Sequence, residues 1–409
     1  MIAYHFPPLA GSSGIQRSLR FVQHLPRFGW EPLVLSANAR AYERTSQDLD
    51  GEIPAGTVVR RAFALDAARH LALAGRHLAS TARPDRWTSW RFDGVRQGMR
   101  LIDEFQPRAI WSTFPIATAH VIAAELHRRT ALPWIADFRD PMAQEGYPPD
   151  PKTWQQFEAI EANAIRNARF SMFTTPSAVR DYRDRYAQQA ERILLLENGY
   201  DEDTFAAVEQ AGDTSAPLHP GAVTLLHSGI VYSAERDPTQ LFEALGRLRQ
   251  SGDIVPGTFK LRFRASANDQ LLHRLAAEHA VEPLVDICPP IDYREALREM
   301  LRADALLVMQ GANCNDQIPA KIYEYQRAGR PILCLTDPAG DTAAVMRGAG
   351  GNAIARLDRA DEIVAMLPDF VRAVRAHAVA TPDAEAVRSA SRRSRTEVLA
   401  HRLDDALRG

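Results

Sequence analysis

The sequence lacks any long run of apolar residues. Its apolar stretches, such as Ala305–Met309, have the length of one strand, whereas a helix that spans a membrane needs about 20 residues. The first residues carry neither a basic lead nor an extended apolar segment, so no secretory signal is predicted. We therefore expect a soluble, cytoplasmic protein.

Cysteine is scarce, and neither sign of charge is in excess. The 3 cysteines among 409 residues include no CxxC pair, which is typical of a chain kept in a reducing compartment. The 49 Lys and Arg residues nearly balance the 51 Asp and Glu residues, and this balance argues against a nucleic-acid-binding protein. The 12 histidines show no metal-binding spacing, and no acidic metal motif stands out. We therefore expect no metal and no other cofactor.

What the sequence does contain is an alternation of short apolar runs with longer segments of helical period. This alternation predicts βαβ units around parallel sheets. In the first half, the expected strands are Ile2–Phe6, Pro32–Ser36, Val58–Ala62, Ala109–Thr113, Trp134–Asp137, Phe170–Thr174 and Ile193–Leu196. The expected helices between them are Ile15–Leu25, Phe92–Glu104, Ala117–Arg129, Thr153–Asn167 and Ser177–Ala187.

The alternation stops after Asn198–Asp201 and restarts twenty residues later, so residues 202–221 are expected to form a linker. The strands expected beyond it are Val223–His227, Lys260–Arg264, Leu284–Ile287, Ala305–Met309 and Ile332–Leu335. The helices expected there are Pro238–Arg249, Asp269–His279, Tyr293–Leu301, Ala320–Ala328, Ala344–Arg347 and a final one at Ala384–Leu407.

We therefore predict an α/β protein of two doubly wound lobes that face a cleft. The expected domains are residues 1–200 and 201–383, with the terminal segment 384–409 packing back on the first. In such folds, ligands bind outside the carboxyl ends of the strands.

The first candidate site is the loop Pro7–Gly14, which follows the first expected strand. Its glycines, Gly11 and Gly14, would let a ligand approach the backbone, and the next helix would offer unpaired N–H groups to an anion. The spacing fits neither a P-loop nor the dinucleotide fingerprint. A tight turn between strand and helix explains the same residues.

The second candidate site is the segment Asp316–Glu324. Pro319 suits the first turn of a helix, so Ala320 and Lys321 would present N–H groups to an anion at its N-terminus. A carboxylate before such a helix can bind sugar hydroxyls, and one inside it can hold a ribose diol. An amphipathic helix with a surface pair of Lys321 and Glu324 is the alternative.

Together these features resemble glycosyltransferase family 4, retaining enzymes with the GT-B architecture of two Rossmann-like lobes. The motifs that carry the resemblance are Phe6–Pro8 with Gly11–Arg17, Gly29–Leu35, Asp137–Asp140, Asn198–Asp201, His227–Gly229, Arg236–Pro238 and the acidic pair Asp316 and Glu324. Their order and spacing span nearly the whole chain. The first acid of the pair is usually Glu in this family, so Asp316 is a departure.

The resemblance implies roles for individual residues. The first lobe would bind the acceptor and the second the nucleotide-sugar donor. The implied catalytic residues are Asp137, Asp140 and Asp316. The implied donor-binding residues are Gly229, Arg236, Ile318, Pro319, Ala320, Lys321 and Glu324. The implied phosphate or acceptor loop consists of Gly11, Ser12, Ser13, Gly14 and Arg17.

The expected function is transfer of a sugar from a UDP-, GDP- or dTDP-linked donor to a glycan, a lipid-linked or a small-molecule acceptor. Retention of configuration and a role in envelope or exopolysaccharide synthesis are what the resemblance implies. Two alternatives share the architecture, a nucleotide-sugar 2-epimerase and a relative without catalytic activity. Cations and helix N–H groups, rather than a metal, would stabilise the departing diphosphate.

The segment Arg60–Arg100 is unusually basic for this chain. It holds nine arginines and three acidic residues, with Leu71, Leu73, Leu78, Trp87 and Trp90 among them. Such a surface suits contact with anionic lipid at a membrane. A solvated, partly buried pair of helices is the alternative.

Overall fold

The structure is a computed structural model that describes residues 1–12, 14–72, 78–212 and 214–408. The chain divides into two compact units, one formed by Met1–Asn198 with Arg392–Gly409 and the other by Gly199–Ser391. Ser13, Leu73 and Arg76, which the sequence analysis singled out, lie outside the described residues. Within those residues, no helix combines the length and the apolar character that crossing a bilayer would require.

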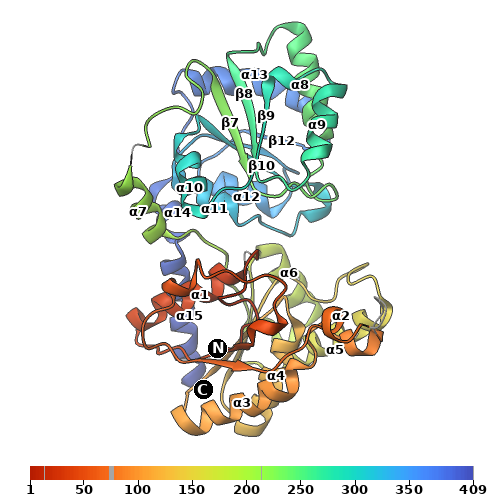
Figure 1. Cartoon of the computed structure of the whole chain (residues 1–409), viewed down its shortest axis with the longest axis vertical. Coiled ribbons are helices and arrows are strands. Elements are labelled where there is room, and N and C mark those ends of the chain that lie inside the picture. Colours follow the sequence, from red (N-terminus) through yellow and green to blue (C-terminus); the bar gives the residue numbers. More distant parts are fainter. Residues whose placement is uncertain (13, 73–77, 213, 409) are drawn as a thin grey trace. The chain divides into compact units, whose positions relative to one another are not determined.

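The first unit is built on parallel strands (Figure 1). Two of them, β1 (Val34–Ala37) and β2 (Val59–Ala62), pair with each other. The other four pair in the order β3 (Ile110–Thr113), β4 (Trp134–Arg139), β5 (Phe170–Phe173) and β6 (Ile193–Leu195). Ile2 bridges in parallel to both Leu35 and Ser112. The N-terminal segment therefore lies between β1 and β3, which gives the spatial order of a doubly wound dinucleotide-binding fold.

The expected strand Ile2–Phe6 is reduced to this bridge, so that prediction was too long. The amide of Phe6 donates to the carbonyl of Tyr4, and that of Leu9 donates to the carbonyl of Phe6. The chain turns away from its neighbours at these bonds, and its backbone groups are satisfied within the loop instead of in a ladder.

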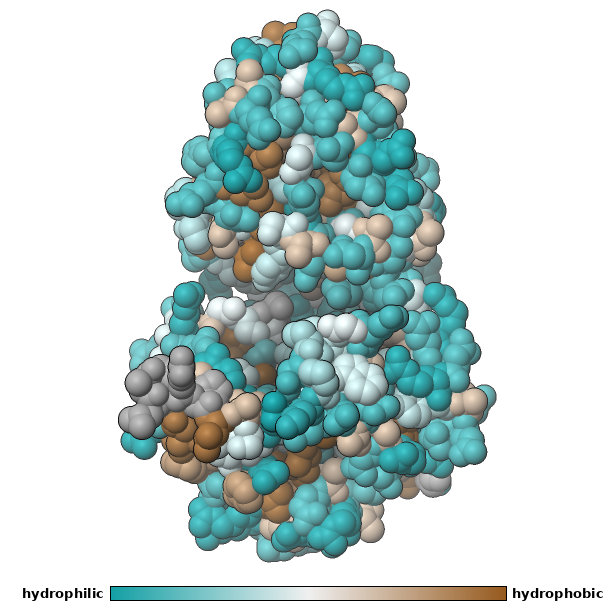
Figure 2. Space-filling model, turned by 90° about the vertical axis from the view of Figure 1, so that its right-hand side faces the viewer, coloured by the Kyte–Doolittle hydropathy of each residue, from teal (hydrophilic) through white to brown (hydrophobic). Residues whose placement is uncertain are grey.

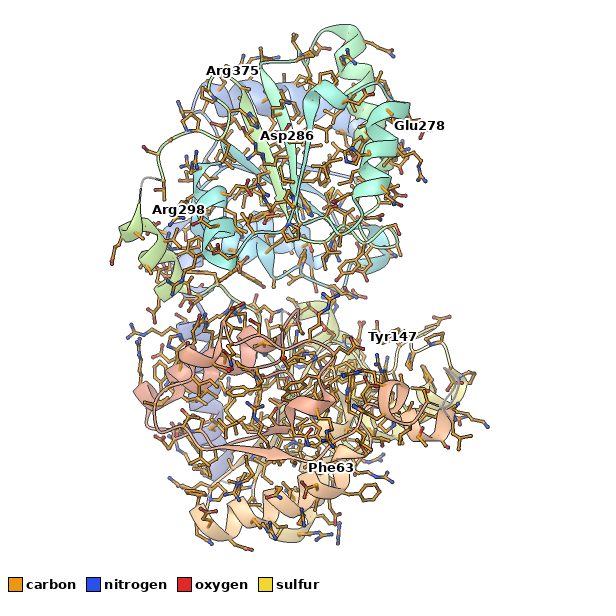
Figure 3. All side chains as sticks on the ribbon, in the orientation of Figure 1. Phe63, Tyr147, Glu278, Asp286, Arg298 and Arg375 are labelled. Atoms are coloured by element: carbon orange, nitrogen blue, oxygen red, sulfur yellow. The ribbon has the colours of Figure 1, made fainter. Side chains whose placement is uncertain are left out.

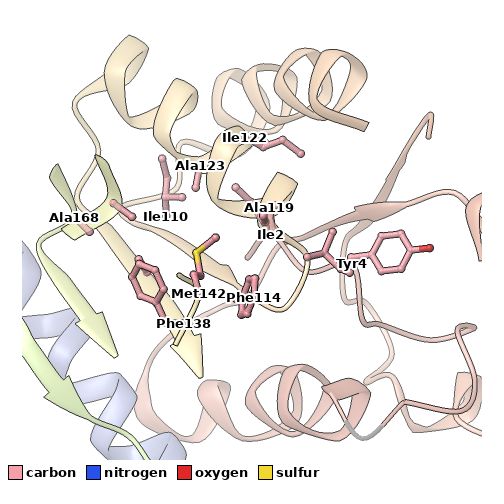
Figure 4. Close-up of a cluster of buried hydrophobic side chains, with 14 of the residues drawn as sticks. Ile2, Tyr4, Ile110, Phe114, Ala119, Ile122, Ala123, Phe138, Met142 and Ala168 are labelled. Atoms are coloured by element: carbon pink, nitrogen blue, oxygen red, sulfur yellow. The ribbon is translucent and has the colours of Figure 1, made fainter. Parts of the chain in front are cut away.

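Helices cover both faces of this sheet. One face carries α3 (Trp90–Phe105), α4 (Ala117–Thr130), α5 (Pro151–Asn167) and α6 (Pro176–Arg185), with the short α2 (Ala67–His70) in a connecting loop. Figure 4 shows part of the core beneath them, in which Phe138 and Phe114 lie beside Met142. The other face carries α1 (Gly14–His24) and α15 (Arg392–Leu407). Asp150 and Thr175 cap α5 and α6, and a proline follows each cap.

The second unit contains one parallel sheet in the order β12 (Ile354–Ala355), β11 (Ile332–Leu335), β10 (Ala305–Met309), β7 (Val223–Ser228), β8 (Phe259–Arg264) and β9 (Val285–Cys288). The chain runs outward from β7 through β8 to β9 and then returns to β10 on the other side of β7. The loops that follow β7 and β10 therefore diverge at a topological switch point, where open α/β sheets form ligand sites.

The helices of this unit also form two layers. The layer on one face contains α8 (Thr239–Ser251), α9 (Asp269–Glu278) and α13 (Ala360–Arg375). The other layer contains α7 (Glu202–Ala211), α10 (Tyr293–Arg302), α11 (Lys321–Ala328), α12 (Asp341–Gly348) and α14 (Ala384–Ser389). Apolar residues fill both interfaces, because buried parallel strands are apolar on both faces.

The elements of the structure differ from the predicted ones in three places. The expected linker 202–221 begins with helix α7, because the Asp201 carboxylate accepts from the amide of Thr204 at 3.2 Å and Phe205 and Val208 bury one helical face. Helix α13 and strand β12 were not predicted; α13 contains Pro368, a residue that usually ends helices. The expected helix Ala384–Leu407 is two helices separated at Ala390–Ser391.

Candidate functional site

The site that we favour lies in the second unit, on the two loops that diverge at the switch point. Residues 229–238 join β7 to α8, and residues 310–320 join β10 to α11. The two loops are tied together, since the amide of Gly311 donates to the carbonyl of Glu235 at 2.6 Å and the Asn313 side chain donates to the carbonyl of Ala234 at 2.8 Å. The loops therefore form a single ordered edge.

Two cations belong to this edge. Arg236 Nε donates to the side chain of Gln310 at 3.3 Å, and its guanidinium lies 5.3 Å from the ring centre of Tyr232. Lys321 Nζ lies 3.1 Å from His227 Nε2. A Cβ atom on Gly229 would lie 3.0 Å from that same Nζ, and the backbone there has a φ of 120°. Glycine at position 229 therefore makes room for the ammonium group.

The ammonium group of Lys321 is electrostatically strained. Burial, and secondarily the charge of Arg236, lower the pKa of Lys321 to about 7, although Glu324 opposes the shift. Burial and Lys321 also hold the pKa of His227 well below its ordinary value. His227 Nδ1 donates to the carbonyl of Leu307 at 3.0 Å, so its Nε2 presents a lone pair to Lys321. The imidazole orients Lys321 without adding charge.

The carboxylates of the second candidate segment differ in their surroundings. Glu324 lies in the first turn of α11 and accepts from the Tyr293 hydroxyl at 2.7 Å. Asp316 is exposed in the preceding loop, which is anchored where Thr342 Oγ1 donates to the carbonyl of Gln317 at 3.0 Å. Ile318 and Pro319 are buried, and Ala320 precedes the first residue of the helix.

The edge therefore brings together Gly229, Arg236, Lys321 and the N-terminus of α11, which the sequence analysis assigned to the donor site. Sequence reasoning missed Tyr293, Gln310 and Tyr325, whose hydroxyl accepts from the amide of Ser228 at 2.8 Å. No local pattern marks these residues, because each acts across a distance of many residues. Chemically, the arrangement can hold an anion between two cations and offer a carboxylate to hydroxyl groups.

The described residues include no candidate metal site. Over the residues that the structure describes, no group of three or more His, Cys, Asp or Glu side chains is placed to hold a metal ion. The expectation that no metal is needed stays a prediction.

Three cations on β8 of the second unit are neutralised by ion pairs. On β8, Lys260 Nζ lies 3.0 Å from Oδ1 of Asp286, which Figure 3 labels on the sheet. Arg264 Nη2 lies 2.7 Å from Glu299 Oε1. Arg262 pairs with both of these carboxylates. Such pairs satisfy the charges of this sheet face. Lys321 differs from these three residues, because its ammonium group contacts an imidazole.

The candidate residues of the first unit have different surroundings. Arg17 forms a bidentate ion pair with Asp137, with both N–O distances at 2.8 Å, and Asp137 also accepts from Thr113 Oγ1 at 3.0 Å. Both charged side chains are buried, at 4% and 0% exposure. Arg17 also donates to the carbonyl of Leu196 at 2.9 Å. These two predicted site residues thus pair inside the unit.

The remaining residues of that loop surround the start of α1. Gly11 has a φ of 80°, Ser12 Oγ lies 3.2 Å from His5 Nδ1, and Gly14 is the first residue of the helix. Asp140 directly follows β4 and is half-buried. Asp137, Asp140 and this loop all lie at the carboxyl edge of the first sheet.

Sequence comparison finds one short match, whereas structure comparison finds matches over almost the whole chain. No protein-family profile matches the chain. A segment of 86 residues is 28% identical to an uncharacterized chloroplastic methyltransferase of Arabidopsis thaliana, and this match spans 21% of the chain and 24% of that protein.

Solved structures match almost the entire chain. A glycosyltransferase from Rickettsia africae is 11% identical with a TM-score of 0.66, over 99% of this chain and 97% of that one. HepE from Anabaena, solved in complex with UDP and with UDP-glucose, is 13% identical with TM-scores of 0.64 and 0.63, over 97% of this chain and 98% of that one. Sucrose-phosphate synthase from Thermosynechococcus elongatus is 12% identical with a TM-score of 0.64, over 99% and 97%. With its two parallel-stranded units, the chain has the GT-B fold of two Rossmann-like lobes.

Proposed function

We propose that the protein is a glycosyltransferase that moves a sugar from a nucleotide diphosphate donor to an acceptor, with retention of configuration. The observation that carries the proposal is the pair of cations, Arg236 and Lys321, at the switch-point edge of the second unit beside a helix N-terminus. The similarity to HepE, which was solved with UDP-glucose, supports a nucleotide-sugar donor. A role in envelope or exopolysaccharide synthesis is part of this proposal.

The proposed chemistry follows from charge. Cleavage of a glycosyl phosphate bond leaves negative charge on the departing diphosphate, and Arg236 and Lys321 would stabilise that charge together with the N–H groups of α11. Glu324 would accept hydrogen bonds from the ribose hydroxyls, and Asp316 would accept them from the sugar. In the first unit, Asp140 is the carboxylate that we propose acts near the acceptor, because Asp137 is paired with Arg17.

The sharpest test of the nucleotide site is Glu324→Ala. We expect its affinity for nucleoside diphosphates to fall about tenfold or more, since a carboxylate that accepts two hydroxyl hydrogen bonds is removed. Calorimetry with UDP, GDP and dTDP measures this and identifies the preferred base. Glu278→Ala, an exposed acidic position on α9 labelled in Figure 3, is the matched control. Unchanged binding by Glu324→Ala would contradict the assignment.

Turnover separates the possible activities. Incubation with labelled UDP-, GDP- and dTDP-sugars should give nucleotide release or sugar transfer if the protein is a glycosyltransferase. An epimerised nucleotide sugar would identify a 2-epimerase instead. Binding without turnover, across a panel of acceptors, would identify a non-catalytic relative.

We also propose that the segment Arg60–Arg100 contacts an anionic membrane surface. Among its described residues, Leu78 is 74% exposed, Phe92 69% and Phe63 45%. On the face drawn in Figure 2, hydrophilic residues predominate and apolar ones form small groups. Apolar side chains beside arginines suit insertion at the headgroup level.

Sedimentation with anionic liposomes tests this contact. We expect wild-type protein to pellet at low salt and the double variant Leu78→Asp with Phe92→Asp to remain in the supernatant, because aspartates at both positions oppose insertion and repel anionic lipid. Neutral liposomes are the control for charge. Failure of the wild type to pellet at any salt concentration would refute the membrane contact.

A further inference from the structure

Arg139 is a cation without a partner. Over the residues that the structure describes, no carboxylate lies within 4.0 Å of its guanidinium, and none of its five N–H donors reaches an acceptor. Its Nε atom is buried and has no hydrogen-bond partner. Buried polar groups are nearly always satisfied in proteins, so an unsatisfied charged one requires an explanation.

The backbone holds Arg139 in this place. Its φ of 61° is left-handed, a conformation that residues other than glycine uncommonly adopt. The amide and the hydroxyl of Thr174 both donate to the carbonyl of Arg139, each at 2.9 Å. The register with β5 shifts between Asp137 and Arg139. This irregularity turns the side chain out of the alternation that a regular strand would impose.

The side chain reaches the start of α1. A Cβ atom on Gly14 would lie 2.5 Å from Arg139 Nη1 and would also collide with His5 Nδ1. Burial, and secondarily Arg139 itself, lower the pKa of His5 to about 3, so that imidazole is neutral. Asp140 and the paired residues Arg17 and Asp137 are the charges that act on the guanidinium electrostatically.

A structural role would look different. Two other arginines of the same unit reach buried acceptors. Arg17 binds Asp137 and backbone carbonyls, and Arg185 binds Glu161 and the carbonyl of Ala143. Arg139 has neither kind of acceptor. Arg169 also has a buried Nε without a hydrogen-bond partner, but its guanidinium lies 5.6 Å from the ring centre of Phe170. Arg139 is only half-buried as a residue, but its Nε atom is buried without a partner. An unpaired and partly desolvated charge opposes folding, and such groups are retained where a ligand supplies the missing partner.

We propose that Arg139 binds an oxyanion, a phosphate or a carboxylate, on the acceptor substrate. This inference rests on the proposed function, in which the first unit takes the acceptor. The second unit already supplies Arg236 and Lys321 for the diphosphate of the donor, so the cation in the first unit matches a separate anionic group. The planar fork of the guanidinium suits a bidentate contact with either oxyanion.

The test uses the full chain with inorganic phosphate and acetate as probes. The nucleoside diphosphate that binds best first saturates the second unit; if none binds, the double variant Arg236→Gln with Lys321→Met replaces saturation. Melting temperature is then followed against each probe at constant ionic strength. The variants are Arg139→Asn, which tolerates a left-handed backbone, and Arg139→Lys, which keeps the charge. Arg128→Gln, an exposed arginine of the same unit, is the matched control.

We expect at least one probe to raise the melting temperature of the wild type and of Arg128→Gln. Its apparent affinity should fall roughly 10- to 100-fold in Arg139→Asn and by a smaller factor in Arg139→Lys, as is usual for the loss of a charge-assisted contact. Without probe, Arg139→Asn should melt no lower than the wild type, because it removes an unpaired charge. Its affinity for the nucleoside diphosphate should be unchanged.

Four results would overturn the proposal. The first two concern the probes: phosphate and acetate raise the melting temperature of wild type and Arg139→Asn equally, or neither probe raises that of the wild type. The third is a lower melting temperature of Arg139→Asn than of the wild type without probe. The fourth is a loss of affinity for the nucleoside diphosphate in Arg139→Asn. The last would assign Arg139 to the donor diphosphate. Absence of nucleotide binding to the wild type would instead refute the proposed function, and the probe arm would still decide the role of Arg139.

Discussion

Binding of a nucleoside diphosphate should draw a proton onto Lys321. Without ligand, burial and Arg236 hold the pKa of Lys321 at about 7, so at pH 7.5 only about a quarter of the molecules carry the ammonium ion. A bound diphosphate would restore the ordinary pKa, since two negative charges favour the protonated form. Lys321 should therefore take up about three-quarters of a proton when the ligand binds at pH 7.5, and only about a tenth at pH 6.

Calorimetry in buffers of different ionisation enthalpy measures this uptake. The terminal phosphate of the ligand titrates at about pH 6 in both proteins, so the wild type is compared with Lys321→Arg. The binding enthalpy of the wild type should depend more strongly on the buffer than that of the variant at pH 7.5, and this difference should nearly vanish at pH 6. In Lys321→Arg, the side chain at this position should take up no proton at either pH, because arginine stays charged throughout. An equal dependence on the buffer in the wild type and in Lys321→Arg at pH 7.5 would refute the reasoning.

Lys321 should also make the free energy of unfolding depend on pH. In the unfolded chain its pKa is ordinary, near 10.5, whereas in the ligand-free fold it is about 7. Between these values the unfolded state binds more protons, so the free energy of unfolding should rise with pH across that window. The contribution is unfavourable at full strength below pH 7, and Lys321→Met should remove it. A denaturation series from pH 6 to pH 10 on both proteins checks the sign.

Three further variants test single contacts. Asp137→Asn breaks the buried bidentate ion pair and should lower the free energy of unfolding by about 3–5 kcal/mol in a denaturant titration; unchanged stability would leave a purely catalytic role. Gly229→Ala introduces a Cβ at a φ of 120° and 3.0 Å from a lysine ammonium, and should weaken nucleotide binding roughly tenfold by calorimetry. Tyr293→Phe removes one hydrogen bond to Glu324 and should cost about 0.5–1.5 kcal/mol of unfolding free energy; no loss would show that the hydroxyl contributes nothing.

The sequence predicted most of the regular elements because each repeats a strong local signal. The apolar run Ala305–Met309 is strand β10 with the expected bounds, and Pro319 does precede helix α11. Helix α7 was missed because only two large apolar residues, Phe205 and Val208, mark its buried face. In addition, an aspartate such as Asp201 is as common in loops as at the start of a helix.

Individual contacts were less predictable than elements. The Asp316–Glu324 segment pointed to the edge that carries Lys321, because helix N-termini and paired acids have local spacing. The ion pair of Arg17 with Asp137 joins residues 120 positions apart, and no local pattern reports it. The unpaired state of Arg139 is equally invisible in sequence, since it depends on a backbone irregularity and on which neighbours are absent.

The return of α15 to the first unit has a consequence for biosynthesis. Leu399 and Leu403 complete the same apolar layer as Phe21 and Trp111, so this layer stays open until α15 has left the ribosome. The segment Gly199–Ser391 emerges earlier and its residues contact mainly one another, so it can fold while the first unit is still incomplete. A stop codon shortly before α15 would then yield a folded second unit attached to a first unit whose apolar layer stays exposed, a species prone to aggregate or be degraded.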